Sequence, residues 1–513
     1  RYATLADENR INLRLLAPPR GRIVDRFGRP IAENQQNYRL QLVPEDVKGS
    51  DIEEVIASVR QIVELSDNDK RRIIREVRRN RAFVPITLRE NLDWSEVARL
   101  EINAPDLPGV MIDVGRSRHY LYGPEISHVL GYVAPVAEDD EDKDPLLKLP
   151  GFRIGRAGVE KVHDLSLRGT GGNSQVEVNA YGRMIRELSR REGQPGAEVM
   201  LTIDVGLQEY IAKRLGEESA SVVVMDVRNG DILSMVSNPS FDSNDFNRGL
   251  SNKLWKSLVD DERAPLINKS IAGMYSPGST FKMIVLLAAL EKGVINADNK
   301  INCNGEYDLG DAKFHCWKRH GHGNMDAKDA IAQSCDVYFY EIAKRTGIDR
   351  IAAMARKFGF DAPTGVDLPG ERGGLMPTRD WKRMKHDEPW VQGETVISGI
   401  GQGFILATPL QLALMTSRIA NGGLAVVPHL TRAVGGKPIP TITPDAQNSL
   451  NIPPRHMDLA QLGMEEVVNG ERGTARRSAT TIEGFAMAGN TGTVQVRRLA
   501  KAGREAGGRK KKC

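Results

Sequence analysis

The pattern of apolar and polar positions changes near residue 195, and this change predicts a division of the chain. Residues 1–195 are irregular and rich in arginine, proline and glycine, with short strand-like runs such as Tyr38–Val43. Within them, residues 51–80 carry apolar side chains at helical spacing, with charges on the opposite face. The glycines and proline of Gly193–Gly196 are typical of a boundary.

Beyond this boundary the pattern predicts a strand, a capped helix and a hairpin in succession. Val199–Ile203 is a candidate strand, and Asp204 is placed to cap a helix over Val205–Leu215. Two apolar runs within Ser221–Ser237 flank Asn229-Gly230, a dipeptide that favours a tight hairpin turn.

Farther along, the apolar spacing is mainly helical. We expect helices over residues 280–292, 326–346, 348–358 and 408–421. A last strand-like run, Val494–Val496, lies near the end of the chain. A hairpin followed by a helix-rich region and a further strand indicates an α+β fold.

Length and composition narrow the class of protein. A chain of 513 residues is too long for one compact core and predicts two or three domains. Hydrophobic content of 40% and charged content of 27% are ordinary for a globular protein. A net charge of +4 is small for this length and gives no indication of nucleic-acid binding. No run of eighteen apolar residues is present to span a membrane.

The segment Ser276–Glu291 carries the clearest chemical signal. Ser279 follows Pro277-Gly278 and begins a strongly apolar helix, which places Lys282 on the same helical face one turn later. A lysine shielded from water by such a helix can act as the general base for a serine nucleophile. A serine and a lysine at this spacing often occur by chance as a helix cap and a surface lysine. The surrounding sequence and the apolar helix make this segment far more specific.

Two further motifs follow in the order that a serine acyltransferase of this type requires. Ser334-Cys335-Asp336 lies 55 residues after Ser279, and Asn490–Thr493 lies near the end. Such enzymes combine a nucleophile and its lysine, a serine-containing motif that relays protons, and a Lys-Thr-Gly strand that holds the substrate.

These motifs resemble those of class B penicillin-binding proteins of the elongation type, the penicillin-binding protein 2 group. The resemblance covers nearly the whole chain. Besides the three motifs, it is carried by Pro18–Arg26, Gly155–Glu160, Leu201–Asp204 with Gln208, His320–Gly323, Gly401–Gly403 and Thr408–Gln411.

The resemblance implies an elongated, β-rich pedestal (dimerisation-type) domain over residues 1–195. It implies a transpeptidase domain with an antiparallel sheet flanked by helices over residues 196–496. Residues 497–513, which are mostly basic, are expected to be a disordered tail.

The resemblance also implies a mechanism. Ser279 would attack a peptidoglycan stem peptide ending in D-Ala-D-Ala, with Lys282, Ser334 and Asp336 as catalytic partners. Asn490, Thr491, Gly492 and Thr493 would hold the substrate. β-Lactams would acylate the same serine, and no organic cofactor would be needed.

By the same resemblance we expect a protein at the periplasmic face of the inner membrane. A single N-terminal anchor would lie upstream of Arg1. The partners would be a membrane glycosyltransferase and the scaffold proteins of cell elongation, and nucleic acid would not be one.

The chain departs from the family pattern at two places. Asn490 stands where the family has lysine, and the basic tail follows where the family has two more strands and a helix. From these departures we expect slow acylation and an unfinished sheet whose edge strand carries Thr491.

Three of the four cysteines lie within 33 residues, a clustering that indicates a metal site more than a disulfide framework. We expect a structural zinc bound by Cys303, Cys316, His322 and Cys335, since a set of three cysteines and one histidine is common for zinc. Some members of the resembling group carry a metal here, with aspartate at the positions of Cys303 and Cys316. His315 and His320 are rival ligands, and the alternative to a metal is three buried free thiols.

Two other functions remain open from the sequence. A serine β-lactamase shares the three motifs but would not need nearly 200 residues of pedestal. A catalytically impaired scaffold or sensor with the penicillin-binding fold is the other alternative, which Asn490 keeps open.

Overall fold

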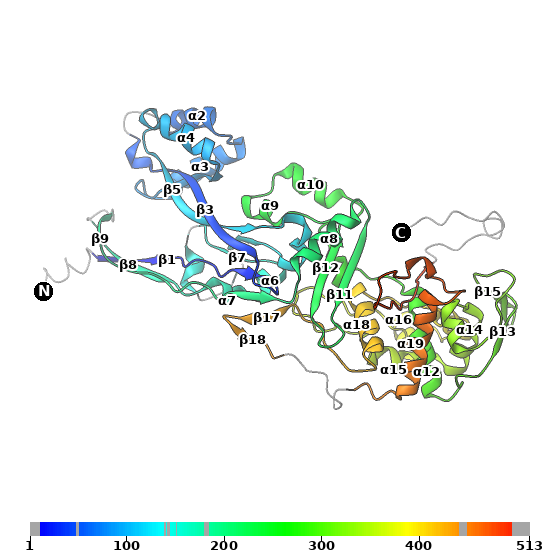
Figure 1. Cartoon of the computed structure of the whole chain (residues 1–513). Coiled ribbons are helices and arrows are strands. Elements are labelled where there is room, and N and C mark those ends of the chain that lie inside the picture. Colours follow the sequence, from blue (N-terminus) through cyan, green and yellow to red (C-terminus); the bar gives the residue numbers. More distant parts are fainter. Residues whose placement is uncertain are drawn as a thin grey trace. The chain divides into compact units, whose positions relative to one another are not determined.

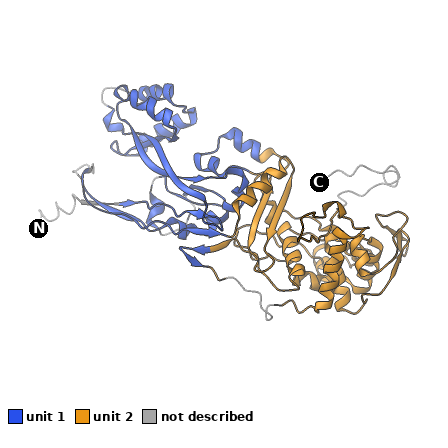
Figure 2. Cartoon of the chain, viewed as in Figure 1, with its two compact units in different colours: residues 1–201, 241–258, 433–438 blue, residues 202–240, 259–432, 439–513 orange. Residues whose placement is uncertain are grey.

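The computed structural model describes residues 11–47, 51–137, 140, 144–149, 151–178, 184–440 and 449–494 (Figure 1). The chain forms two compact units (Figure 2). Unit 1 comprises residues 1–201, 241–258 and 433–438, and unit 2 comprises residues 202–240, 259–432 and 439–513. The predicted domain bounds stay a prediction, and the predicted tail lies outside the described residues.

Unit 1 is built on a seven-stranded sheet with the order β18-β17-β10-β2-β3-β4, in which β5 also pairs with β3. A separate three-stranded sheet has the order β1-β8-β9. The strands are β1 (Ile11–Leu16), β2 (Ile23–Val24), β3 (Pro30–Leu42), β4 (Ile86–Leu92), β5 (Val110–Tyr120), β6 (Val133–Pro135), β7 (Arg153–Gly155), β8 (Gly172–Val178), β9 (Met184–Arg191), β10 (Val199–Leu201), β17 (Thr431–Val434) and β18 (Lys437–Pro438).

The helices of unit 1 are short, and the predicted helical stretch 51–80 is confirmed as two of them. Ser66 separates the two because its side chain accepts from the backbone of Asp69 in a capping box, which begins a new helix. The helices are α2 (Ile52–Ile62), α3 (Asp67–Arg79), α4 (Trp94–Ile102), α5 (Ser127–Leu130), α6 (Gly158–Val162), α7 (Asp164–Arg168), α9 (Ser243–Arg248) and α10 (Asn252–Asp260).

A buried ion-pair network holds unit 1 together around Glu160. Its carboxylate receives the guanidinium groups of Arg20 at 2.7 Å and Arg118 at 2.6 Å. Burial alone would raise the pKa of Glu160, but the two arginines outweigh it and hold the pKa below its usual value. The segment Gly155–Glu160, singled out in the sequence, therefore has a structural role here.

Unit 2 contains the predicted capped helix and hairpin. The Asp204 side chain accepts from two backbone N–H groups at the start of α8, which runs over the predicted residues. Ala220–Met225 and Ile232–Asn238 form an antiparallel pair, β11 and β12. In the described part of unit 2, this pair forms a two-stranded sheet of its own.

The rest of unit 2 is mostly helical. Its helices are α8 (Val205–Leu215), α11 (Lys269–Ala272), α12 (Lys282–Glu291), α13 (Ala327–Ala332), α14 (Asp336–Thr346), α15 (Ile348–Lys357), α16 (Arg379–His386), α17 (Gln392–Ser398), α18 (Pro409–Ala420) and α19 (Pro454–Asn469). Four short strands form two small ladders: β13 (Ile301–Cys303) with β16 (Gly323–Met325), and β14 (Glu306–Leu309) with β15 (Ala312–His315).

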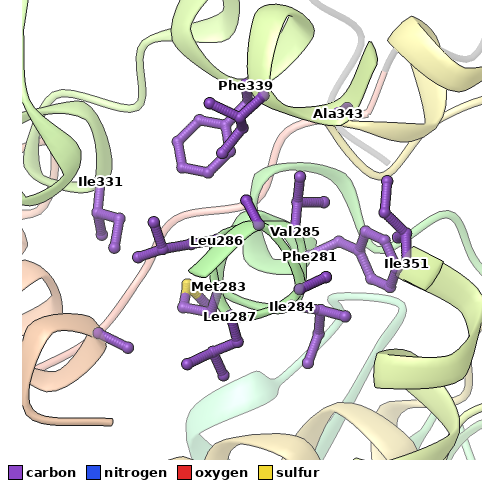
Figure 3. Packing of buried hydrophobic residues seen from close by; sticks show 14 of the residues in the cluster. Phe281, Met283, Ile284, Val285, Leu286, Leu287, Ile331, Phe339, Ala343 and Ile351 are labelled. Atoms are coloured by element: carbon purple, nitrogen blue, oxygen red, sulfur yellow. The ribbon is translucent and has the colours of Figure 1, made fainter. Parts of the chain in front are cut away.

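The centre of unit 2 is α12, which is apolar on all sides. Every residue from Lys282 to Leu290 is buried, and side chains such as Ile331, Phe339 and Ile351 surround the helix (Figure 3). A helix that is hydrophobic all round belongs in the core of a large domain. The nucleophile motif at its start is therefore anchored in the hydrophobic core of the unit.

One expected strand is not observed. Residues 489–494 form no strand, and residues 495 and 496 lie outside the described ranges. The apolar run at Val494 thus did not predict local structure, because a strand requires a partner strand for its backbone hydrogen bonds. Within the described residues, no helix is both long and apolar enough to cross a membrane.

Candidate active site

Ser279 sits in a tight turn just before α12. It belongs to a 3₁₀ turn, Gly278–Phe281, so the predicted helix 280–292 begins with one tighter turn. Gly278 has φ of +59°, and its N–H donates to the Gly401 carbonyl at 2.9 Å. A Cβ on Gly401 would lie 2.1 Å from the carbonyl oxygen of Gly278. Both positions therefore favour glycine, which lets the Gly401–Gly403 segment support the turn.

Lys282 makes three hydrogen bonds in a buried position. Its Nζ lies 2.8 Å from Asp336 Oδ1, 2.9 Å from Ser334 Oγ and 3.0 Å from the Ser334 carbonyl. An ammonium group has three protons to donate, and here each has an acceptor. The Ser334 hydroxyl in turn donates to Ser279 Oγ at 3.0 Å. The hydrogen-bond route from Lys282 to Ser279 thus runs through Ser334.

Ser334 interrupts what the sequence predicted as one helix over residues 326–346. Its φ of +52° lies in the left-handed region, which is unusual for a residue with a Cβ. Cys335 then donates its N–H to Ala330 and takes the N-cap position of α14. This break turns the Ser334 side chain towards Ser279 and places Asp336 in the first turn of α14. Backbone strain of this kind commonly occurs at functional sites.

Trp317 is a site residue that the sequence reasoning missed. Its backbone N–H donates to Asp336 Oδ2 at 2.9 Å, and its indole Nε1 donates to the Ser334 carbonyl at 2.9 Å. It therefore holds both polar residues of the second motif. The feature of the sequence that could have pointed to Trp317 is its position directly after Cys316, a candidate metal ligand.

The third motif lies against the nucleophile turn without being a strand. A Cβ on Gly278 would lie 3.0 Å from the Thr493 carbonyl oxygen and 3.3 Å from its nitrogen. The Asn490 amide lies 3.3 Å from the Ser279 carbonyl and 2.8 Å from Met283 Sδ. The structure thus brings Asn490, Thr491, Gly492 and Thr493 beside Ser279, as the sequence predicted.

Cys303, Cys316, His322 and Cys335 form one buried cluster. Their candidate ligand atoms all lie within 4.8 Å of one another. Cys303 Sγ and Cys316 Sγ approach His322 Nδ1 to 3.6 and 3.5 Å. The ladders β13–β16 and β14–β15 bring Cys303, Cys316 and His322 together, and Cys335 lies at the N-cap of α14. The rival His315 is exposed beside Glu306, and the exposed His320 is not part of the cluster either.

The thiols of this cluster perturb one another. A hydrogen bond from Cys335 lowers the pKa of Cys316 to about 3, whereas the same interaction and burial raise the pKa of Cys335. His322 Nε2 is buried and has no hydrogen-bond partner within the described structure. Three thiols and an imidazole at these distances fit a tetrahedral metal, since zinc prefers such a set.

Comparison with known proteins agrees with this geometry. Residues 15–201 match the penicillin-binding protein dimerisation domain, and residues 220–507 match the penicillin binding protein transpeptidase domain. The peptidoglycan D,D-transpeptidases MrdA of Haemophilus influenzae and Escherichia coli K12 are each 37% identical. Each alignment covers 96% of this chain, and it covers 77% and 79% of the two relatives.

Solved structures show the same fold. A complex of penicillin-binding protein PBP2 with MreC from Helicobacter pylori is similar with a TM-score of 0.80 and 30% identity, over 95% of this chain and 90% of that one. Pseudomonas aeruginosa PBP2 in complex with WCK 5153 has a TM-score of 0.71 and 32% identity, over 94% of this chain and 86% of that one.

The fold and the site define a two-domain penicillin-binding protein, and the chain belongs to that family. Within the family it belongs to the penicillin-binding protein 2 group, and its activity is that of a serine-type peptidoglycan D,D-transpeptidase of cell elongation. The predicted fold class and function are thereby confirmed. The β-lactamase alternative loses its support, because residues 15–201 match a dimerisation domain.

Proposed function

We propose that the transpeptidase activity proceeds through an acyl-enzyme on Ser279. The observation that carries this proposal is the continuous hydrogen-bond chain from Ser279 through Ser334 to Lys282, with Asp336 at its end. A nucleophilic hydroxyl needs a base within reach of its proton, and this chain supplies a route to one.

The reaction begins when the chain of hydrogen bonds reverses. Lys282 first gives one ammonium proton to Asp336, with which it is paired. Ser279 then passes its proton to Ser334, Ser334 passes its own to the Lys282 amine, and Ser279 Oγ attacks the penultimate D-alanine carbonyl. The backbone N–H groups of Ser279 and Thr493 stabilise the oxyanion. Collapse of the intermediate breaks the peptide bond and releases D-alanine, which takes back the proton. An amine of a neighbouring stem peptide then attacks the acyl-enzyme and forms the cross-link. The ester bond to Ser279 breaks, and the proton lost by the amine returns to Ser279 Oγ.

We also propose that the cysteine cluster binds a structural zinc. Cys303, Cys316, His322 and Cys335 are the ligands. The metal supplies a rigid cross-link between loops and takes no part in proton transfer. Two ligands adjoin active-site groups, since Cys316 precedes Trp317 and Cys335 lies between Ser334 and Asp336. The cluster therefore fixes the second motif relative to Lys282.

Partners and location are proposals by analogy with relatives. The Helicobacter pylori relative is seen with MreC, and the Pseudomonas aeruginosa relative with WCK 5153. We propose that this chain binds β-lactams and an elongation scaffold of the same kind, and works beside a membrane glycosyltransferase. Its substrate lies outside the inner membrane, so we place the protein at the periplasmic face. The N-terminal anchor stays a prediction.

A protease-accessibility experiment tests this location. In cells with a permeabilised outer membrane and an intact inner membrane, added protease should degrade the protein while a cytoplasmic marker survives. The proposal fails if the protein is protected until the inner membrane is also opened.

Replacing Asn490 with lysine is expected to speed penicillin acylation about tenfold. The family has lysine at this position, and a charge-assisted hydrogen bond contributes about 1.5–3 kcal/mol, or one to two decades in rate. We expect the lower end of that range, because Arg476 and Arg477 line a pocket together with the adjacent Thr491. The rate is measured with a fluorescent penicillin, and Asn490→Gln is the uncharged control.

If the original chain acylates as fast as Asn490→Lys, the lack of a charge at position 490 does not slow acylation and this prediction is wrong. If neither the original chain nor Asn490→Lys acylates, the result favours the remaining alternative, a scaffold or sensor that has lost acylation.

A further inference from the structure

The third motif of this chain lacks the charge that a carboxylate substrate needs. Both hydrogens of the Asn490 amide already have acceptors, the Ser279 carbonyl and Met283 Sδ. Its oxygen accepts the Thr491 N–H at 2.7 Å. The Lys282 ammonium is paired with Asp336. Neither residue is therefore free to bind the terminal carboxylate of a donor peptide.

A second source of positive charge lies beside Thr491. Residues 473–478 and Thr491 line an open pocket of about 730 Å³. Arg476 and Arg477 are exposed along it, and no ion pair joins either to a carboxylate of the described residues. Arg476 makes only a long contact of 3.5 Å from Nη1 to the Glu471 carbonyl. Two adjacent unpaired guanidinium groups thus border a polar pocket.

This pocket is tied to both the second and the third motif. The Thr474 hydroxyl lies 3.0 Å from the Thr491 hydroxyl, and the Thr474 N–H donates to the Ala332 carbonyl at 3.2 Å. Ala332 ends α13, two residues before Ser334. The Ala475 N–H donates to Val467 of α19, so the segment is held at both sides. The backbone segment that carries the two arginines is therefore held beside Thr491 at the pocket.

We propose that the Arg476–Arg477 pair, together with the Thr491 hydroxyl, binds the terminal carboxylate of the donor peptide. A guanidinium matches a carboxylate with two parallel hydrogen bonds and keeps its charge at every working pH. The pair thereby supplies the charge that Asn490 lacks. This inference deepens the proposed function and rests on its assignment of Ser279 and Thr491.

The first test compares substrates with and without the carboxylate. In Arg476→Ala/Arg477→Ala, acylation by benzylpenicillin should slow about tenfold or more, because a charged hydrogen bond is lost. Acylation by its methyl ester should stay within about twofold. Arg476→Lys/Arg477→Lys should recover part of the rate. Arg472→Ala, an exposed arginine outside the pocket lining, is the matched control and should match the parent chain.

A double-mutant cycle tests whether the two arginines supply the positive charge that a lysine at position 490 supplies in the family. In the Asn490→Lys background the same arginine substitutions should cost less than about threefold, because the new charge is redundant with theirs. If the arginine substitutions slow acylation equally in both backgrounds, the arginines do not substitute for the charge of a lysine at position 490. An equal loss for acid and ester would show that the arginines act on folding or shape instead.

Non-covalent binding separates this inference from the acylation mechanism. In the Ser279→Ala variant, a peptide ending in D-Ala-D-Ala should bind better as the free acid than as the C-terminal amide, measured by NMR titration. That preference should disappear when both arginines are alanine. If it persists, or if the parent shows none, the arginines are ordinary solvated surface residues. Failure of Ser279 as nucleophile would instead appear as a penicillin adduct on another residue.

Discussion

Replacing Ser279 with alanine is expected to abolish covalent labelling by penicillin. Its hydroxyl is linked by a hydrogen bond to Ser334 and, through Ser334, to the buried Lys282. Intact-mass spectrometry should show the adduct on the parent chain and none on the variant. Digestion should place the adduct on the peptide that contains Ser279. An adduct that survives in Ser279→Ala would contradict the assignment.

Removing the base should have a smaller but still large effect. General-base catalysis contributes about 10²–10⁴-fold in rate, so we expect Lys282→Gln to slow acylation by that factor. This substitution also leaves the carboxylate of Asp336 without its partner, and such a loss can destabilise a protein by about 3–5 kcal/mol.

A second variant separates catalysis from folding. Lys282→Gln/Asp336→Asn removes both charges and should melt closer to the parent, yet acylate as slowly as Lys282→Gln. Thr416→Ala, which removes an exposed hydroxyl from α18, controls for the loss of a surface hydrogen bond. A double variant that regained the parent rate would show that Lys282 is structural and not the base.

The second large effect is expected from removing the metal. Protein purified without chelator should contain about one equivalent of zinc, and a strong chelator should lower both its melting temperature and its acylation rate. Structural zinc contributes directly to folding free energy, so the loss of stability should be several kcal/mol. Less than about half an equivalent in the untreated protein would refute the site.

The loss of rate follows from the neighbours of the ligands. A metal would restrain the segment after Cys316, so we expect its removal to weaken the hydrogen bond from the Trp317 N–H to Asp336. Loss of a hydrogen bond to a charged group predicts a decrease of about one to two decades in acylation. Cys316→Ala should reproduce the effect of the chelator, while Cys513→Ser should not. Equal zinc content in Cys316→Ala and the parent would show that this thiol is not a ligand.

The sequence alone determined the elements whose causes are local. The Asp204 cap defined the start of α8, and an unbroken apolar run predicted the buried α12. The hairpin β11–β12 was also predicted, although its loop is longer than the tight Asn229-Gly230 turn. The order and spacing of the three motifs were sufficient to identify the family, while Ser279 as the nucleophile stays a prediction. The cysteine clustering likewise predicted four residues that do lie together.

The tertiary structure decided what depends on contacts between distant segments. Periodicity predicted one helix over residues 326–346, but the left-handed Ser334 breaks it and turns its hydroxyl towards Ser279. Helical spacing placed Lys282 near Ser279, yet the hydrogen bonds that connect them pass through Ser334, which lies 52 residues after Lys282. Within the described residues the third motif forms no strand up to Val494, because a strand depends on a partner, which no local pattern supplies. Trp317 and Thr474 matter through hydrogen bonds to residues farther along the chain, and only folding brings those partners together.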